Sequence, residues 1–441
     1  MPRRLYLTGL DWIIGALDYS MKRSTGMGNA SQIVLLMDGR PDAAALAARL
    51  SEFLPRFPQI AGRIKRDWLN LAPYWKPLSG ARMPGLATYD LGAPLMIDDY
   101  LAPEAVRVLE GYINTPFGGG DDMLSFNLTR FVDGRAALSM GFDHKILDAR
   151  GAELLLDLFV RYANGKLTLD EAARGLEQSR PAGLTRWAEK FLSGRDVNRR
   201  FIEMKSRGEA RTLPMPIGRG RVDYHIRRFS EQETTRILDL ASQRAGFMME
   251  LPYMLSRTLG SMGALFGGPK GALYVVPVTV DTRAAQKGAG PAAQIFFNYS
   301  SFMFFTVPDD AGADEATGAI KKQMYDQVQM GFPQKLAHAA QLMRIAPFGM
   351  IDSIIRRFFG KGSSSLSFSY LGRQSFKSAS VMGANVIDLL HMPRVPTPPG
   401  LGVFFNTFGG RMSMTISWMD GLMERDAAYR LGDEIAARLM K

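Results

Sequence analysis

The chain has 441 residues and contains no cysteine. Without a thiol the protein forms no disulfide, has no thiolate nucleophile and offers no cysteine ligand to a metal. Histidine is also scarce, since only four are present, and no two of them have the spacing of metal ligands, so we expect no metal site. The lack of cysteine is typical of cytoplasmic proteins, and we expect that location.

Several other signatures are missing. No apolar run approaches the roughly 18 residues of a membrane-spanning helix. The first eleven residues lack a long apolar stretch and a small-residue cleavage site, so we expect no secretory signal. The sequence has no Gly-x-Ser-x-Gly elbow, no Walker A loop and no complete Gly-x-Gly-x-x-Gly. These absences argue against a serine hydrolase, a phosphate-cradling enzyme and a dinucleotide-binding enzyme.

Length and charge describe what remains. A chain of 441 residues is long for one hydrophobic core, so we expect two domains of roughly 200 residues. Between Arg195 and Arg221 there are eight basic and three acidic residues, and two prolines follow Leu213. This stretch is the expected connection, which predicts domains at 1–205 and 206–441. The net charge of +11 suits an anionic partner, but no nucleic-acid-binding motif accompanies it, and we expect no nucleic acid.

Apolar periodicity predicts two rounds of alternating strands and helices, an α/β pattern. The predicted strands cover 31–37, 123–131, 136–142, 222–229, 272–280, 300–307, 365–371 and 403–418. The predicted helices cover 42–53, 103–113, 151–160, 231–243, 251–265, 315–330 and 423–439.

The most informative element is the His-x-x-x-Asp sequence from His144 to Asp148. The turn pair Asp133-Gly134 predicts a hairpin before it, and residues 151–160 have helical spacing after it. His144 therefore lies at a strand-to-helix junction, where its side chain can project into a cleft. Although isolated His-x-x-x-Asp patterns are common by chance, this setting makes His144 the best candidate for a general base. The other three histidines, His225, His338 and His391, lack such a setting, and we interpret them as surface or packing residues.

A weak internal repeat points to duplication. Residues 134–140 resemble residues 410–416, and each segment is a turn followed by a strand. The alignment places Asp420 opposite His144 and Glu424 opposite Asp148. If the halves are duplicates, one active site lies between two similar domains; chance similarity of two amphipathic hairpins is the alternative.

These residues, together with distant segments, resemble the chloramphenicol acetyltransferase-like superfamily. That superfamily includes peptide-synthetase condensation domains, wax ester synthases and plant acyltransferases of the His-x-x-x-Asp type. Residues 274–283 resemble its apolar strand with a proline and a closing arginine, and residues 294–299 resemble the segment that follows. Residues 366–373 are similar to the Phe-Asn-Tyr-Leu-Gly element of condensation domains, and residues 35–40 to the wax ester synthase opening.

The resemblance implies two similar α/β sandwich domains that form a pseudo-dimer with a central cleft. It implies an acyltransferase in which His144 is the general base and no covalent enzyme intermediate forms. A positioned base of this kind contributes roughly 10²–10⁴-fold. By the same resemblance, Asp148 holds the loop by pairing with Arg283, Gly151 has a structural role beside the site, and Asn298 is a candidate contact to the substrate or the transition state. No cofactor is bound permanently; acyl-CoA or an acyl carrier protein thioester is the co-substrate.

The sequence also departs from the family pattern. Asp143 replaces the first of two paired histidines, and Ala149-Arg150-Gly151 follows the aspartate where many members have glycine. Three readings therefore stay open: an acyl-CoA-dependent transferase acting on a hydroxyl or amine, a condensation enzyme that uses an acidic carrier protein, and a catalytically silent binding or scaffold protein. The 26 methionines and 26 phenylalanines, with an amphipathic stretch at 351–359, favour a lipid-like acyl chain and peripheral contact with the inner membrane surface. An ordinary packed helix is the alternative for that stretch.

Overall fold

The structure of the protein is a computed structural model. It describes residues 5–68, 71–117, 122–176, 186–208, 210–213, 220–267, 271–283, 290–359 and 364–441, and of residues 355–359 it describes the backbone alone. None of the helices in these ranges is long and apolar enough to cross a membrane.

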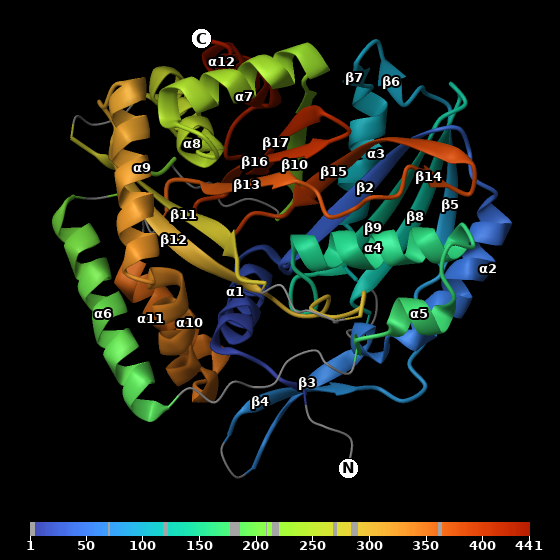
Figure 1. Cartoon of the computed structure of the whole chain (residues 1–441), viewed down its shortest axis with the longest axis horizontal. Coiled ribbons are helices and arrows are strands. Elements are labelled where there is room, and N and C mark those ends of the chain that lie inside the picture. The colour runs from blue at the N-terminus through green and yellow to red at the C-terminus, as the bar shows by residue number, and fades with distance from the viewer. Residues whose placement is uncertain are drawn as a thin grey trace.

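Two six-stranded sheets dominate the described residues (Figure 1). The first contains β2 (Ala30–Asp38), β5 (Leu86–Leu91), β8 (Leu124–Phe131), β9 (Ala136–Asp143), β14 (Ser380–Val381) and β15 (Ala384–Pro393). The second contains β10 (Val222–Arg228), β11 (Leu273–Asp281), β12 (Ser300–Pro308), β13 (Ser367–Arg373), β16 (Leu401–Phe408) and β17 (Arg411–Met419). The strand orders are β14-β15-β2-β9-β8-β5 and β10-β17-β16-β13-β11-β12. Two small sheets combine β1 (Leu5–Tyr6), β4 (Pro73–Pro77) and β3 (Gly62–Arg66), and β6 (Met96–Ile97) with β7 (Tyr100–Leu101).

Helices cover the sheets (Figure 1). They are α1 (Gly9–Thr25), α2 (Ala43–Phe53), α3 (Pro103–Ile113), α4 (Ala149–Ala163), α5 (Leu169–Ala173), α6 (Trp187–Ser206), α7 (Glu231–Ala245), α8 (Glu250–Phe266), α9 (Ala313–Gln329), α10 (Phe332–Ala340), α11 (Phe348–Phe359) and α12 (Arg425–Leu439). One core lies between the first sheet and helices α2 and α4, and a second lies between the other sheet and helices α7, α8, α9 and α12. A third apolar cluster joins α3 to β2, β10 and β15 and so fastens the two sheets together.

The two sheets share a four-strand arrangement. In the first, β5 runs parallel to β8, and β8, β9 and β2 pair antiparallel in turn. In the second, β13 runs parallel to β16, and β16, β17 and β10 pair antiparallel in turn. A helix follows each hairpin, and Asp148 and Glu424, which the repeat aligns, occupy the N-cap positions of α4 and α12. The topology is thus duplicated, while the superposition of two halves as a pseudo-dimer stays a prediction.

Strand β15 belongs to the first sheet although it lies late in the chain. It pairs antiparallel with β2 over most of its length, and Asp388 on β15 accepts a hydrogen bond from Arg228 on β10 at 2.5 Å in the buried space between the sheets. The predicted division at residues 205 and 206 does not include this exchange, and it stays a prediction.

Most predicted elements are present within one or two residues of their expected ends, and the mixed α/β class is confirmed. Besides the two-residue strands, the periodicity missed α1, β3, β4, β5, α5, α6, α10 and β15. The expected connection at 195–221 overlaps the second half of α6, while residues 209 and 214–219 lie outside the described residues. The amphipathic stretch at 351–359 belongs to α11, which packs against α1.

Candidate active site

His144 lies in a short loop between the end of β9 and the start of α4. Its backbone N–H donates to the carbonyl of Asn29 at 3.0 Å, and the N–H of Phe297 donates to the carbonyl of Ile146 at 2.5 Å. The loop is therefore held on one side by the start of β2 and on the other by the segment 294–299, which comes from the second half of the chain. These backbone bonds fix where the His144 side chain begins.

Asp148 ends this loop and fastens it in three ways. Its Oδ1 accepts from the N–H of Gly151 at 2.8 Å, which caps α4. Its Oδ1 also accepts from Nη2 of Arg283 at 2.5 Å, and its Oδ2 accepts from the N–H of Tyr299 at 2.8 Å. Burial lowers the pKa of the Arg283 guanidinium, but the carboxylates of Asp148 and Asp281 together outweigh it, so the pKa lies above its ordinary value. The structure thus brings Asp148 and Arg283 together.

Gly151 allows the first turn of α4 to approach the segment 294–299. A Cβ at this position would lie 2.1 Å from the carbonyl oxygen of Ile295, so only glycine fits without a backbone shift. Within that segment Gln294 and Phe297 have φ angles of 61° and 71°, which is uncommon for residues with a side chain. The tight contact explains a structural role for Gly151.

Asn298 supports the loop that carries His144 through a hydrogen bond to its backbone. Its Nδ2 donates to the carbonyl oxygen of His144 at 2.9 Å, and its backbone N–H donates to Oδ1 of Asp11 on α1 at 3.0 Å. Asp11 is held in turn by a capping box with Thr8. Asn298 is 3% exposed and is not among the residues that line the pocket. The structure therefore gives it a supporting contact, and its contact with substrate stays a prediction.

A pocket of about 230 Å³ opens beside His144 and is lined by both sheets. The first half contributes Ser31, Gln32, Phe142, His144, Asp148, Ala149 and Arg150. The second half contributes Thr279, Val280, Asp281, Arg283, Ser300, Ser369, Tyr370, Leu371, His391, Met392, Pro393 and Phe404. The wall combines apolar surface, from residues such as Phe142, Leu371 and Phe404, with polar and charged side chains from both halves, and such a combination is typical of a small-molecule site.

The surroundings of His144 favour the neutral imidazole. Burial lowers its pKa below the ordinary value, against the opposing charges of Asp148 and Asp143. Its Nδ1 is enclosed and has no hydrogen-bond partner among the described residues, so Nε2 is the nitrogen open to the pocket. The ring of Phe142 meets the imidazole edge-on at 5.7 Å. A neutral imidazole that faces a pocket can accept a proton from a bound molecule.

Asp143 is part of a buried charge cluster. Nζ of Lys145 lies 3.0 Å from Oδ2 of Asp143 and 3.0 Å from Oδ2 of Asp18. Burial lowers the pKa of Lys145, but the two carboxylates raise it above its ordinary value. The aspartate therefore ties the loop to α1 through Lys145, and it does not line the pocket.

His391 is the residue that sequence reasoning missed. We interpreted it as a surface or packing residue, yet it lines the same pocket as His144 and is bonded through Nε2 to Oε1 of Glu153 at 2.9 Å. Its position follows from the crossing of β15 into the first sheet. The nearest signal in the sequence is a histidine inside an apolar run, which alone does not indicate a pocket. The other two, His225 and His338, do not line it.

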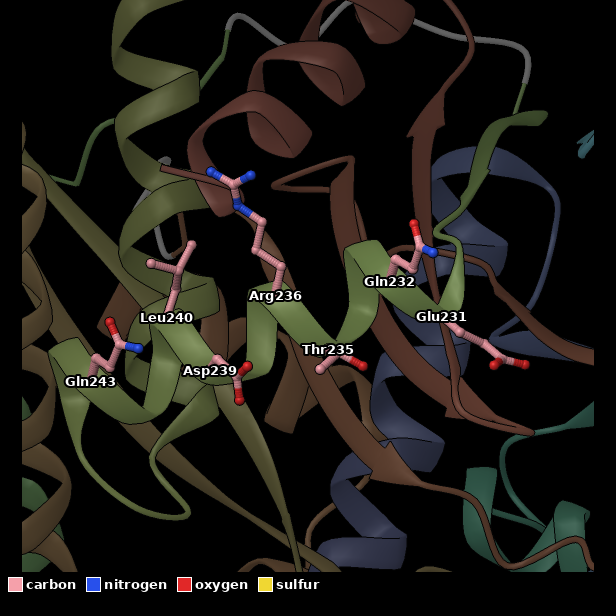
Figure 2. Close-up of a pocket in the computed structure, with 7 residues that line it drawn as sticks. All are labelled: Glu231, Gln232, Thr235, Arg236, Asp239, Leu240 and Gln243. Carbon is pink, nitrogen blue, oxygen red and sulfur yellow. The ribbon is translucent and has the colours of Figure 1, made fainter.

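A second hollow of about 620 Å³ runs along the outer face of α7 (Figure 2). Figure 2 shows its lining side chains on this one helix: Glu231, Gln232, Thr235, Arg236, Asp239, Leu240 and Gln243. Their charges are mixed and they do not converge on a point, so we assign no site there. Among the described residues, no group of three histidine, aspartate or glutamate side chains is arranged to hold a metal ion.

Comparisons with solved structures identify the fold. The first condensation domain of the CDA synthetase superposes with a TM-score of 0.68 at 14% identity, covering 99% of this chain and 95% of that one. A trichothecene 15-O-acetyltransferase from Fusarium sporotrichioides gives 0.68 at 12% identity, covering 99% and 94%. TRI101 of F. graminearum, complexed with coenzyme A and deoxynivalenol, gives 0.63 at 14% identity, covering 97% and 98%.

No family model matches the sequence, and neither does any curated protein. The structural likeness extends over nearly the whole chain, so the protein has the fold of these condensation domains and acetyltransferases. The predicted α/β fold of condensation domains and acyltransferases is confirmed, and its pseudo-dimer arrangement stays a prediction. At 12–14% identity this likeness shows the fold alone.

Proposed function

We propose that the protein transfers an acyl group from a thioester, acyl-CoA, to a hydroxyl or amine. The observation that carries the proposal is the placement of His144: its imidazole has a lowered pKa and faces a pocket that both sheets line. The fold supports the proposal, because similar structures include an acetyltransferase complexed with coenzyme A.

The chemistry needs one base and no covalent intermediate. Nε2 of His144 accepts the proton of the acceptor O–H or N–H while the oxygen or nitrogen attacks the thioester carbonyl. The tetrahedral intermediate then collapses, the carbon–sulfur bond breaks, and the imidazolium returns its proton to the thiolate. The products are an ester or amide and a free thiol, so atoms and charge balance.

Other residues act on this step by holding His144 in place. Asp148, Arg283 and Gly151 fix the end of the loop, and Asn298 fixes the carbonyl of His144 itself. Misplacing a base by about 1 Å can cost on the order of 100-fold in rate. We therefore expect substitutions at these positions to lower activity through the geometry of the loop as well as through stability.

A carrier-protein thioester is the second candidate donor. Its support is the fold, since several similar structures are condensation domains, together with a net charge of +11 that suits an acidic carrier as well as the phosphates of CoA. A silent binding protein is the third reading. The donors are distinguished by presenting the same acyl group on CoA and on a phosphopantetheinylated carrier protein.

The decisive experiment measures thiol release from acyl-CoAs of increasing chain length with a panel of alcohols and amines. The protein has no cysteine, so a thiol-reactive dye reports product without background from the enzyme. His144→Ala should lower transfer by at least about 100-fold while the circular dichroism spectrum and melting temperature stay near those of the wild type. His338→Ala, on α10 and outside the pocket, is the matched control and should keep full activity.

Near-normal turnover of purified His144→Ala would remove this residue from the mechanism. Absence of turnover by the wild type with every CoA and carrier-protein donor, alongside retained ligand binding, would favour the silent binding protein.

A further inference from the structure

His391 and His144 lie on the same side of the first sheet. His391 on β15 is paired with Ile33 on β2, and Ile33 is paired with Met140 on β9. Paired residues of neighbouring strands point to one face, and side chains alternate along a strand. Met140 is four positions before His144, so the alternation places both imidazoles toward α4, and both line the pocket of about 230 Å³.

Glu153 on α4 orients the His391 ring. This carboxylate is fully buried; Oε1 lies 2.9 Å from Nε2 of His391, while Oε2 accepts from Nη1 of Arg150 at 3.0 Å and from the N–H of Ser375 at 2.5 Å. Burial raises the pKa of Glu153, but His391 and Arg150 outweigh it, so the pKa lies below its ordinary value and the group is ionised. An ionised carboxylate only accepts hydrogen bonds, so Nε2 must carry the hydrogen.

The other ring nitrogen of His391 is then the one that can meet a ligand. No described residue forms a hydrogen bond to Nδ1, whereas Nε2 is fully occupied by Glu153. In the neutral imidazole with hydrogen on Nε2, Nδ1 is a hydrogen-bond acceptor. An oriented acceptor nitrogen on the pocket wall selects ligands with a donor at that place.

The geometry points to His391, positioned by Glu153, as an acceptor-binding subsite that receives a second O–H or N–H of the molecule to be acylated. This inference rests on the proposed acyl transfer, in which His144 accepts the proton of the first O–H or N–H, the one that is acylated. The strands that carry the two histidines are separated by β2, which is two strand spacings or about 10 Å across the sheet, and His144 lies four positions beyond the register of His391, about 13 Å further along. The second donor therefore lies several bonds from the reacting group, as in a long-chain diol or amino alcohol.

The test uses three acceptors that differ at one end: 1-octanol, 1,8-octanediol and 8-methoxy-1-octanol. The methyl ether keeps the distal oxygen but removes its hydrogen, so it separates donation from polarity. The wild type should prefer the diol in kcat/KM by about 3- to 10-fold, the worth of one hydrogen bond, after a twofold correction for its two equivalent hydroxyls. His391→Ala should lose this preference, so that the corrected value for the diol equals that for 1-octanol.

Further variants keep the test decisive if His391→Ala folds poorly. His391→Asn can present an amide oxygen near the position of Nδ1 and should restore part of the preference, whereas His391→Leu should not. Glu153→Gln tests the positioning residue. It should lower the ratio of kcat/KM for the diol to kcat/KM for the two monohydric alcohols. The matched histidine control is again His338→Ala.

If the pair of His391 and Glu153 were merely structural, His391→Ala would lower kcat/KM for all three acceptors by the same factor, and this result would overturn the proposal. Equal wild-type kcat/KM values for the diol and the methyl ether would overturn it as well. Binding of the three compounds, measured by saturation-transfer NMR, separates the two proposals. A diol preference in binding that is lost in His391→Ala, without turnover from any donor, would retain the subsite and reject acyl transfer. If acyl transfer occurs but the diol is preferred neither in binding nor in turnover, the subsite is rejected and the proposed function is retained.

Discussion

The ion pair between Asp148 and Arg283 makes a quantitative prediction about the loop that carries His144. The two side chains are 8% and 12% exposed, and Nη2 of Arg283 lies 2.5 Å from Oδ1 of Asp148. We consider Asp148→Ala, Arg283→Ala and the double variant. Because each partner is nearly buried, removing one leaves a charge that water cannot solvate well.

The magnitudes follow from the contacts. Asp148→Ala removes the cap of α4, which is worth about 1 kcal/mol. Arg283 then keeps only Asp281 as an ion-pair partner, and the side chain of Asp281 is 44% exposed. We expect a total loss of about 4 kcal/mol in the free energy of unfolding, within the range for a broken buried pair. Arg283→Ala leaves the carboxylate two backbone donors, from Gly151 and Tyr299, so we expect about 3 kcal/mol. The double variant should lose about 5 kcal/mol, a coupling of about 2 kcal/mol.

Urea unfolding followed by far-ultraviolet circular dichroism measures these losses. Asp42→Ala is the control for capping alone, since Asp42 caps α2 at the surface through the N–H groups of Ala44 and Ala45, and it should cost about 1 kcal/mol. Asp148→Asn keeps a capping side chain and removes only the charge, so it should fall between the control and Asp148→Ala.

Losses that add within about 0.5 kcal/mol would refute the coupling. A loss for Asp148→Ala no larger than that for Asp42→Ala would show that only the cap matters and that the ion pair contributes nothing.

Two further predictions concern the same loop. Only the neutral imidazole of His144 accepts a proton, and burial lowers its pKa; kcat/KM should therefore fall with decreasing pH at a midpoint below about 6.5, and a midpoint above 7 in the pH–rate profile would contradict this assignment. Asp148 raises the pKa of His144, so Asp148→Asn should move the midpoint further down. Gly151→Ala should destabilise the protein by about 1–3 kcal/mol because its Cβ would meet the carbonyl of Ile295 at 2.1 Å. Gly111→Ala on α3, where a Cβ has no neighbour within 4 Å, should be neutral or slightly stabilising in the same melts.

The sequence predicted the parts of the site that local patterns encode. The Asp133-Gly134 turn and the alternation before it predicted the β8–β9 hairpin, and the helical spacing after residue 151 predicted α4. These signals place His144 at a strand-to-helix junction because they depend only on neighbours in the chain. The partner of Asp148, 135 positions away, came from the family resemblance, since periodicity carries no information about such distant pairs.

The position of His391 could not be predicted for a physical reason. Residues 384–393 are compatible with a strand, but the pattern of burial is the same whichever sheet the strand joins. Its membership of the first sheet depends on pairing with β2 and on the buried contact between Asp388 and Arg228. α1 was missed for a related reason: its buried face includes Asp11 and Asp18, whose polarity masks the apolar stripe.

Both halves of the chain are needed to build the site. The first half contributes the loop with His144, while Arg283 and the segment 294–299 of the second half hold this loop on one side. The second half also sends β15, with His391, across into the first sheet. A substitution near residue 295 therefore affects the position of His144 through backbone contacts. A substitution on α7 does not, because α7 packs on the core of the second sheet. Sensitivity of the activity should follow these contacts and not proximity in sequence to the His-x-x-x-Asp motif.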